Sequence, residues 1–157
     1  MAWWKKLVSR NSAEEEVDFY KEGVELLNAG KYHEALTSFR LALREAPDDD
    51  AVLQQIAITY TRIGMTDEAI KTYRTALQKN ASAVGAHYGM AFLKLREGKT
   101  EEAIEHLRAF LASPPSEPEA MEHVSHARKT LAQLTGEPVD TIPATSNGYG
   151  QTDPPAT

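Results

Sequence analysis

The stretch Gly30-Lys31-Tyr32-His33-Glu34-Ala35-Leu36 has two later counterparts, Gly64-Met65-Thr66-Asp67-Glu68-Ala69-Ile70 and Gly98-Lys99-Thr100-Glu101-Glu102-Ala103-Ile104. Each copy begins 34 residues after the one before it, and each keeps Gly and then Glu-Ala-Leu/Ile at the same offsets. The same step relates arginines 40, 74 and 108 and leucines 43, 77 and 111. A fixed period of this length is typical of a stacked array of short helical units.

The pattern of apolar residues around these copies predicts seven helices. Ser12-Ala13-Glu14-Glu15 has the composition of a capping box, so the first helix is expected to start there. Asp49 or Asp50, Thr66, Ser82 and Thr100 are the residue types that cap later helices. The expected helices cover about residues 12–28, 33–46, 50–63, 66–79, 82–97, 100–113 and 117–135.

The last of these helices is expected to bury one apolar side made of Met121, Val124, Ala127, Leu131 and Leu134. Pro, Thr, Gly, Ser and Asp dominate from residue 137 onward, with no periodic apolar pattern. Such a composition is typical of a chain that cannot bury enough apolar surface to fold. We therefore expect a helical domain over 13–136 and a disordered tail over 137–157.

The composition of the 157-residue chain excludes several classes of function. Its net charge of −6, with no basic stripe, argues against nucleic acid as a partner. The chain has no cysteine, which excludes disulfides, thiolate metal sites and cysteine nucleophiles, and suits a reducing compartment. No apolar run approaches the roughly 18 residues of a membrane span or resembles a secretory signal, so we expect a cytoplasmic protein.

The N-terminal segment, residues 1–12, is amphipathic. If it is helical, Trp3, Trp4, Leu7 and Val8 share one stripe, and Lys5 and Lys6 point elsewhere. Trp and Lys together are favoured at a membrane interface, so weak contact of residues 1–10 with a membrane surface or membrane complex is one interpretation. A cap on the first repeat, a contact with a partner protein and a frayed end are the alternatives.

The three repeats, at about 16–49, 50–83 and 84–117, resemble tetratricopeptide repeats. The resemblance rests on small residues at matching places, Gly23, Ala57 and Ala91 on first helices and Ala35, Ala69 and Ala103 on second helices. It also rests on the large residues Phe19, Phe39, Tyr60, Tyr73 and Phe110. Glu22, Lys94 and Ala81 stand where Leu, Tyr and Pro are usual. The resemblance implies an all-α fold, an α-solenoid of three helix-turn-helix units with a capping helix at about 117–135.

In this family, the first helix of each unit lines a concave groove, so the resemblance also implies a site that binds a partner. The residues of this sequence that stand at groove positions of the family are Tyr20, Val24, Leu27, Gln54, Ile58, Arg62, Tyr88, Phe92 and Arg96. Apolar and aromatic anchors flanked by a few polar groups suit an extended or helical segment of another protein. The alternative interpretation is that several of these side chains only complete the core between first helices.

Some family members hold a partner's C-terminal carboxylate with basic residues at set groove positions. Tyr20, Val24, Gln55, Gly85 and Gly89 stand at those positions here, and none is basic. Capture of a carboxyl terminus in that way is therefore disfavoured. Small three-unit chaperones of secretion systems have a similar size and organisation.

The sequence gives little support for catalysis, a metal or a cofactor. His123 and His126 share one side of the last helix and form a potential metal pair, but no third ligand is evident. The glycines at 30, 64 and 98 follow helix ends, so they are not placed to cradle a phosphate. The row of arginines at 40, 74 and 108 is expected on the solvated convex side.

We therefore predict a protein-binding adaptor or scaffold without enzymatic activity. The first alternative is a peripheral subunit or assembly factor of a membrane-associated complex, docked through the N-terminal Trp/Lys segment. The second is a small secretion-type chaperone.

Overall fold

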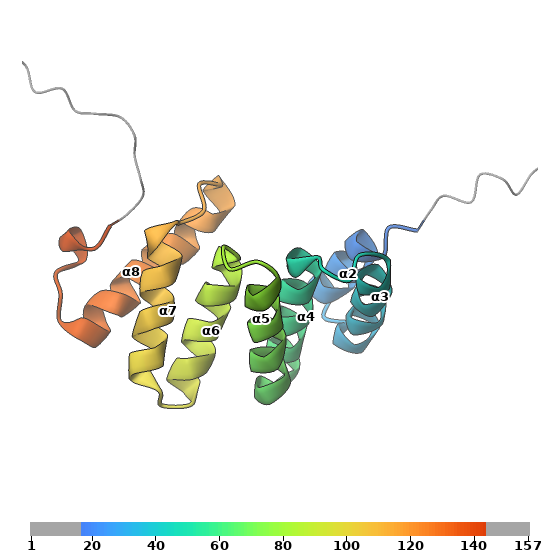
Figure 1. Ribbon diagram of the computed structural model, residues 1–157, viewed down its shortest axis with the longest axis horizontal. Helices are drawn as coiled ribbons and strands as arrows, with labels where there is room; N and C mark the ends of the chain where they lie inside the picture. Colours follow the sequence, from blue (N-terminus) through green and yellow to red (C-terminus); the bar gives the residue numbers. More distant parts are fainter. Residues whose placement is uncertain (1–16, 144–157) are drawn as a thin grey trace, which may run out of the picture.

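The computed structural model describes residues 17–143, which form seven α-helices, two short 3₁₀ segments and no strand. The helices are α2 (Phe19–Asn28), α3 (Tyr32–Glu45), α4 (Asp50–Ile63), α5 (Thr66–Lys79), α6 (Val84–Arg96), α7 (Thr100–Ala112) and α8 (Met121–Thr135). The helix pairs follow one another along the long axis of the molecule, and within the first two pairs the helices overlap in this view (Figure 1). Contacts are most extensive within the pairs α2–α3, α4–α5 and α6–α7, and each pair packs on the next. The predicted all-α array of three units is confirmed.

The three repeated Gly stretches are the turns inside the helix pairs. Gly30, Gly64 and Gly98 have φ angles of 76°, 92° and 76°, a region that favours glycine. One hydrogen bond of 2.9 Å closes each turn, from the amide after the glycine to a carbonyl five residues earlier: Lys31 N to Leu26 O, Met65 N to Tyr60 O and Lys99 N to Lys94 O. This is the pattern of a Schellman motif, so the recurring glycines are structural.

The helix starts differ in part from those expected. Asp49 caps α4 as predicted, and its Oδ1 accepts a hydrogen bond of 2.9 Å from the Ala51 amide. Thr66 and Thr100 are the first helical residues instead of caps, because the tight glycine turn leaves one residue between the glycine and the next helix. Ala83, not Ser82, stands before α6.

The first described helix begins at Phe19, so the expected start at residue 12 is wrong for this helix. Asp18 caps it, and its Oδ1 accepts a hydrogen bond of 3.0 Å from the Lys21 amide. The proposed capping box at 12–15 lies outside the described residues.

Small residues let the helices of a unit approach closely. Gly23 of α2 lies against the ring of Phe39 on α3, and a Cβ at position 23 would lie 2.5 Å from the ring carbon Cε1. The alanines at the other matching positions, 35, 57, 69, 91 and 103, are fully buried. Buried apolar clusters extend from the first unit to α8, so each unit depends on its neighbour for burial.

Glu22 and Lys94, which depart from the family pattern, both have polar partners. The Ser38 hydroxyl donates a hydrogen bond of 3.0 Å to Glu22 Oε2. Lys94 is 5% exposed, and its Nζ lies 2.9 Å from Glu102 Oε2. The hydrogen bond from Lys94 to the Glu102 carboxylate raises the pKa of the lysine, because it favours the charged form.

The last helix is preceded by the 3₁₀ segment η1 (Pro118–Ala120), so the capping element starts with a tighter turn than expected. Val124, Ala127 and Leu131 of α8 are buried as predicted. Met121 is 44% exposed, contrary to the expected apolar side. Gly136, with φ at 76°, ends α8.

The chain does not lose structure at Glu137, as the composition predicted. Residues 137–143, here called the strap, fold back along α7 and α8 through the 3₁₀ segment η2 (Val139–Thr141). Ile142 is 3% exposed and belongs to the apolar cluster of α7 and α8. The prediction of disorder is therefore wrong for residues 137–143, and residues 144–157 lie outside the described part.

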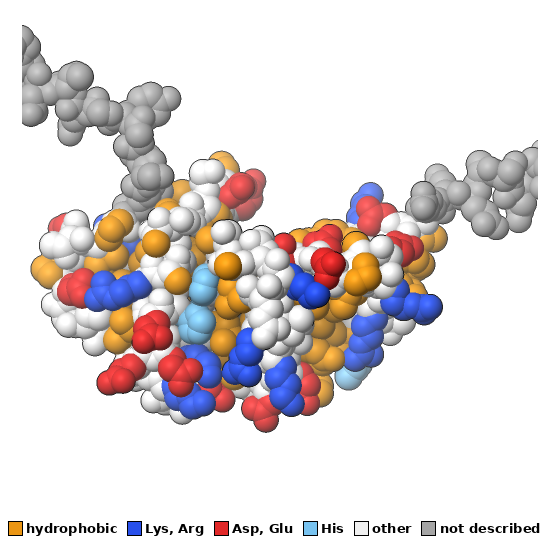
Figure 2. Space-filling model, viewed as in Figure 1, with side chains coloured by type: hydrophobic (Ala, Val, Ile, Leu, Met, Phe, Trp, Pro, Cys, Tyr) orange, Lys and Arg blue, Asp and Glu red, His pale blue; other side chains and the backbone are white. Residues whose placement is uncertain are grey.

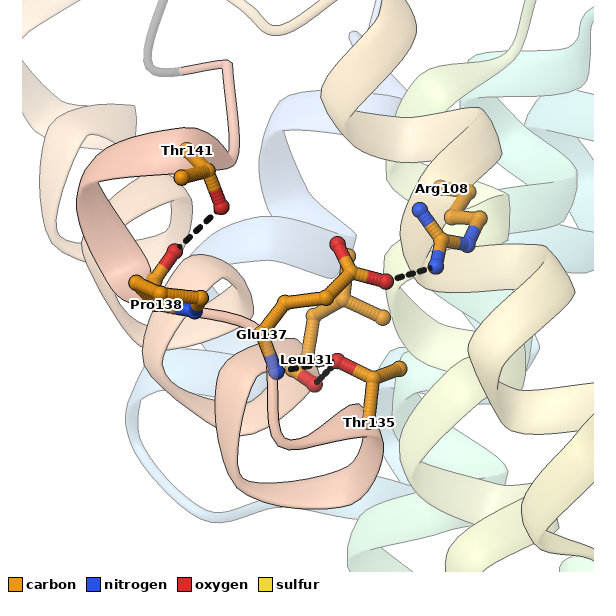
Figure 3. Close-up of polar contacts among 6 residues, drawn as sticks. All are labelled: Arg108, Leu131, Thr135, Glu137, Pro138 and Thr141. Atoms are coloured by element: carbon orange, nitrogen blue, oxygen red, sulfur yellow. Dashed lines mark hydrogen bonds and ion pairs between the residues drawn. The ribbon is translucent and has the colours of Figure 1, made fainter.

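Side chains of α7, α8 and the strap itself hold the strap in place. The Arg128 guanidinium donates hydrogen bonds of 2.9 Å to the carbonyls of Val139 and Ile142. Arg108 of α7 pairs with the Glu137 carboxylate, and the Thr141 hydroxyl donates to the Pro138 carbonyl (Figure 3). Arg108 is thus not simply a solvated member of the arginine row.

No helix within residues 17–143 has the length and hydropathy needed to cross a bilayer.

Candidate functional site

Two adjoining hollows lie along the first helices of the units. The first hollow, of about 340 Å³, is lined by Leu27, Asn28, Gly30, Tyr32, Gln55, Ile58 and Arg62. The second, of about 570 Å³, is lined by Gln54, Ile58, Thr61, Arg62, Tyr73, Gly85, Tyr88, Gly89, Phe92, Leu93, Arg96 and His123. Ile58 and Arg62 of α4 line both, so the two hollows adjoin along α4, and they are together called the groove, which extends from α2 to α8.

The second hollow is also lined by a tyrosine from α5, which is the second helix of its unit. Tyr73 of α5 reaches between α4 and α6 because Gly89 of α6 has no side chain, and the Tyr73 ring occupies the place of a Cβ at 89. Burial raises the pKa of Tyr73 to about 12, although its hydrogen bond with Thr61 acts in the opposite direction. From the sequence, Tyr73 is expected only as one of the large core residues. Gly89, which faces it on α6, is the sequence feature that could have indicated its place in the groove.

Two histidines of α8 lie at the C-terminal end of the groove, and one of them, His123, lines it. The Tyr88 hydroxyl and His126 Nδ1 lie 2.9 Å apart, and the rings of Phe92 and His126 are stacked with centroids 4.7 Å apart. The ring of His123 lies 4.9 Å from that of Tyr88. Burial raises the pKa of Tyr88. The expected potential metal pair thus contacts Tyr88 and Phe92 of the groove.

Seven of the nine predicted partner-binding residues line the groove: Leu27, Gln54, Ile58, Arg62, Tyr88, Phe92 and Arg96. Tyr20 and Val24 line neither hollow. Both are half-buried on the cluster around α3, and the Tyr20 ring lies 6.1 Å from that of Phe39. The predicted docking residues Trp3, Trp4, Lys5, Lys6, Leu7 and Val8 lie outside the described residues, so contact with a membrane or partner there stays a prediction.

Away from the groove, two histidines on the paired helices of the third unit meet. His87 Nδ1 of α6 lies 3.0 Å from His106 Nδ1 of α7, so one imidazole donates and the other accepts. Burial lowers the pKa of both below the ordinary 6.5. The neighbouring His87 also lowers the pKa of His106, as does Lys94, whereas Glu102 and Glu105 raise it. Within residues 17–143, no group of three or more His, Cys, Asp or Glu side chains gathers as a metal site.

This pair makes stability depend on pH. Folding lowers the pKa of both imidazoles, so as the pH falls the unfolded chain takes up protons at a higher pH than the folded chain does. The free energy of unfolding is therefore highest above about pH 6.5 and decreases as the pH falls below that value. We expect the melting temperature, followed by circular dichroism, to fall between about pH 7.5 and 5.5. His106→Gln should reduce this fall, whereas His33→Gln, at an exposed position, should not. An equal fall in all three proteins would contradict the assignment.

The sequence profile of the tetratricopeptide repeat matches residues 26–82 and 64–134, which together cover more than half of the chain. The chain belongs to the tetratricopeptide repeat family. The matched residues contain α4 to α7 and nearly all of α8, and therefore most of the groove. A comparison with curated proteins found no match.

Solved structures share the fold of this tetratricopeptide repeat domain. The type III secretion chaperone SycD of Yersinia enterocolitica, in complex with a peptide of the translocator YopD, has a TM-score of 0.68 at 19% identity, covering 74% of this chain and 88% of that one. PcrH with the chaperone-binding region of PopD has a TM-score of 0.64 at 18% identity, covering 75% and 89%. The first repeat domain of Spaghetti (RPAP3), bound to an HSP90 peptide, has a TM-score of 0.61 at 22% identity, covering 73% and 90%. At these identities the likeness concerns the fold.

Proposed function

We propose that the groove binds an apolar segment of another protein and that the domain acts as an adaptor with no chemistry of its own. The observation that carries this proposal is the pair of adjoining hollows that form the groove. Ile58, Tyr88 and Phe92 form its apolar part and are only half-buried within the described chain. Half-buried aromatic and aliphatic side chains in a hollow are the usual anchors of an interface.

Amide side chains beside these anchors favour a polypeptide as the occupant. Asn28, Gln54 and Gln55 line the groove from α2 and α4. An amide offers both a donor and an acceptor, which matches the N–H and C=O groups of a bound main chain. Gln54 Nε2 already donates to Asp50 at 2.9 Å, so its Oε1 is the atom directed to a ligand in this proposal.

A chaperone is the form of adaptor that the structural neighbours favour. SycD and PcrH, which share the fold, have been solved with a peptide of the translocator YopD and with the chaperone-binding region of PopD. In the same way, the groove described here would cover an apolar segment of a client protein until that client is assembled.

Site-specific crosslinking tests this proposal. A photoreactive benzoylphenylalanine at Phe92, inside the groove, should form adducts with a partner protein in cells, and mass spectrometry should identify the attached segment. The same probe at Gln78, an exposed residue of α5 outside the groove, is the matched control. Adducts that are the same at both positions, or that arise only at Gln78, would contradict the proposal.

A further inference from the structure

The groove carries positive charge in an acidic protein. The two hollows are lined by Arg62 and Arg96 and by no Asp or Glu. The whole chain, in contrast, has 23 acidic and 17 basic side chains, and charges of both signs are interspersed over the face shown in Figure 2. A hollow lined by one sign of charge attracts the opposite charge.

The two arginines occupy equivalent places in neighbouring units. Arg62 lies in the last turn of α4 and Arg96 in the last turn of α6, and both are exposed. Neither forms a salt bridge with another residue of the described range 17–143. The one carboxylate on α4, that of Asp50, accepts hydrogen bonds from the Gln54 and Asn80 side chains and does not line the groove.

We propose that the segment bound in the groove is acidic as well as apolar, with carboxylates that pair with Arg62 and Arg96. This inference rests on the proposed function and adds the class of partner. The apolar anchors of the segment contact Ile58, Tyr88 and Phe92, and its carboxylates lie along the edge formed by the C-terminal ends of α4 and α6. A guanidinium suits this role because its fork of N–H donors matches a carboxylate.

The repeat spacing sets the spacing of the carboxylates. Helices that contact each other, as α4 and α6 do at a few points, have axes about 8–10 Å apart. An extended chain advances about 3.3 Å per residue, so two carboxylates about three residues apart reach both arginines. The expected partner therefore has acidic residues at this interval, with apolar side chains between or beside them.

An arginine in the last turn of a helix also stabilises the helix dipole, and this purely structural role predicts no preference for an acidic ligand. Arg74 of α5 provides the matched control. It is an exposed arginine that lines a different surface, together with Asp67, Lys71 and Glu97. Changing it to Gln removes one positive charge, as each of the two changes in the groove does, without touching the groove.

Selection from a random library of displayed peptides of about twelve residues tests the inference without knowledge of the natural partner. The full chain, Arg74→Gln, and the double variant Arg62→Gln with Arg96→Gln are each used as bait, after circular dichroism confirms that they fold. We expect the full chain and Arg74→Gln to enrich peptides that are both apolar and acidic. The double variant should enrich apolar peptides without acidic bias, and bind the acidic ones about tenfold more weakly at low salt.

Other outcomes would overturn this inference alone or together with the proposed function. If the full chain enriches apolar peptides with no acidic bias, or the double variant keeps that bias, the role of the arginines is overturned and the groove remains the site. If Gly85→Leu, which narrows the groove, enriches the same peptides as the full chain, both proposals fall. If the tenfold difference in affinity persists in about 500 mM salt, it does not come from exposed ion pairs and the inference is contradicted.

Discussion

Replacing Gly89 with alanine should lower the free energy of unfolding by about 1–3 kcal/mol, which is the usual cost of overpacking a core. In an ordinary helix interior the same change raises stability by up to about 1 kcal/mol, because alanine is the better helix former. Here the added Cβ would meet the ring of Tyr73, whose Cε2 lies 2.7 Å from its position. That ring is buried in the apolar cluster of α4, α5 and α6, so we expect the clash to outweigh the gain in helix propensity.

Gly85→Ala is the matched control on the same helix. An added Cβ at 85 would meet only the amide end of Gln54, which is the far end of a flexible side chain. We therefore expect unchanged or slightly increased stability. Urea unfolding followed by circular dichroism compares the two variants. If Gly89→Ala is as stable as Gly85→Ala, the close approach of Tyr73 to α6 is wrong.

Gly85→Leu should weaken binding of groove-selected peptides by about 100-fold or more, which corresponds to the loss of about 2.7 kcal/mol or more of binding free energy. Gly85 is exposed and lines the second hollow between Gln54 and Tyr88. A leucine side chain there would occupy the space in which the ligand's apolar anchors are proposed to lie. Because position 85 faces the groove and not the core, the fold should be unaffected.

Gln78→Leu is the control for this variant. It places the same side chain at an exposed position of α5 outside the groove, and binding should remain at the level of the unchanged chain. Fluorescence anisotropy with a labelled peptide measures both affinities. Equal binding by Gly85→Leu and Gln78→Leu would show that the peptides bind elsewhere.

The repeat period predicted the helical array well because three copies repeat the same packing rules. The glycine turns and the buried alanines at matching positions follow from it directly. The helix starts were less predictable, since the glycine turn puts Met65 and Lys99 at cap positions where they make no side-chain cap. The strap was missed because one apolar residue, Ile142, anchors it, and a single residue has no periodicity.

The groove was predictable where it follows the repeat and not where it depends on the ends of the array. Ile58, Arg62, Tyr88 and Phe92 line it as expected from their unit positions. Tyr20 does not, and it packs near Phe39 instead. The contacts of His123 and His126 with Tyr88 and Phe92 depend on how α8 packs at the end of the array, which no feature of the repeat determines.

An NMR titration of the full chain with a selected peptide tests the central claim most directly. The claim is that the groove, not the opposite side of the array, binds a polypeptide segment. We predict that the amide signals of α4 and α6 around Ile58, Gly85 and Phe92 shift on binding, together with those around His123 of α8. Shifts confined to the exposed residues of α3, α5 and α7, with the groove signals unchanged, would contradict it.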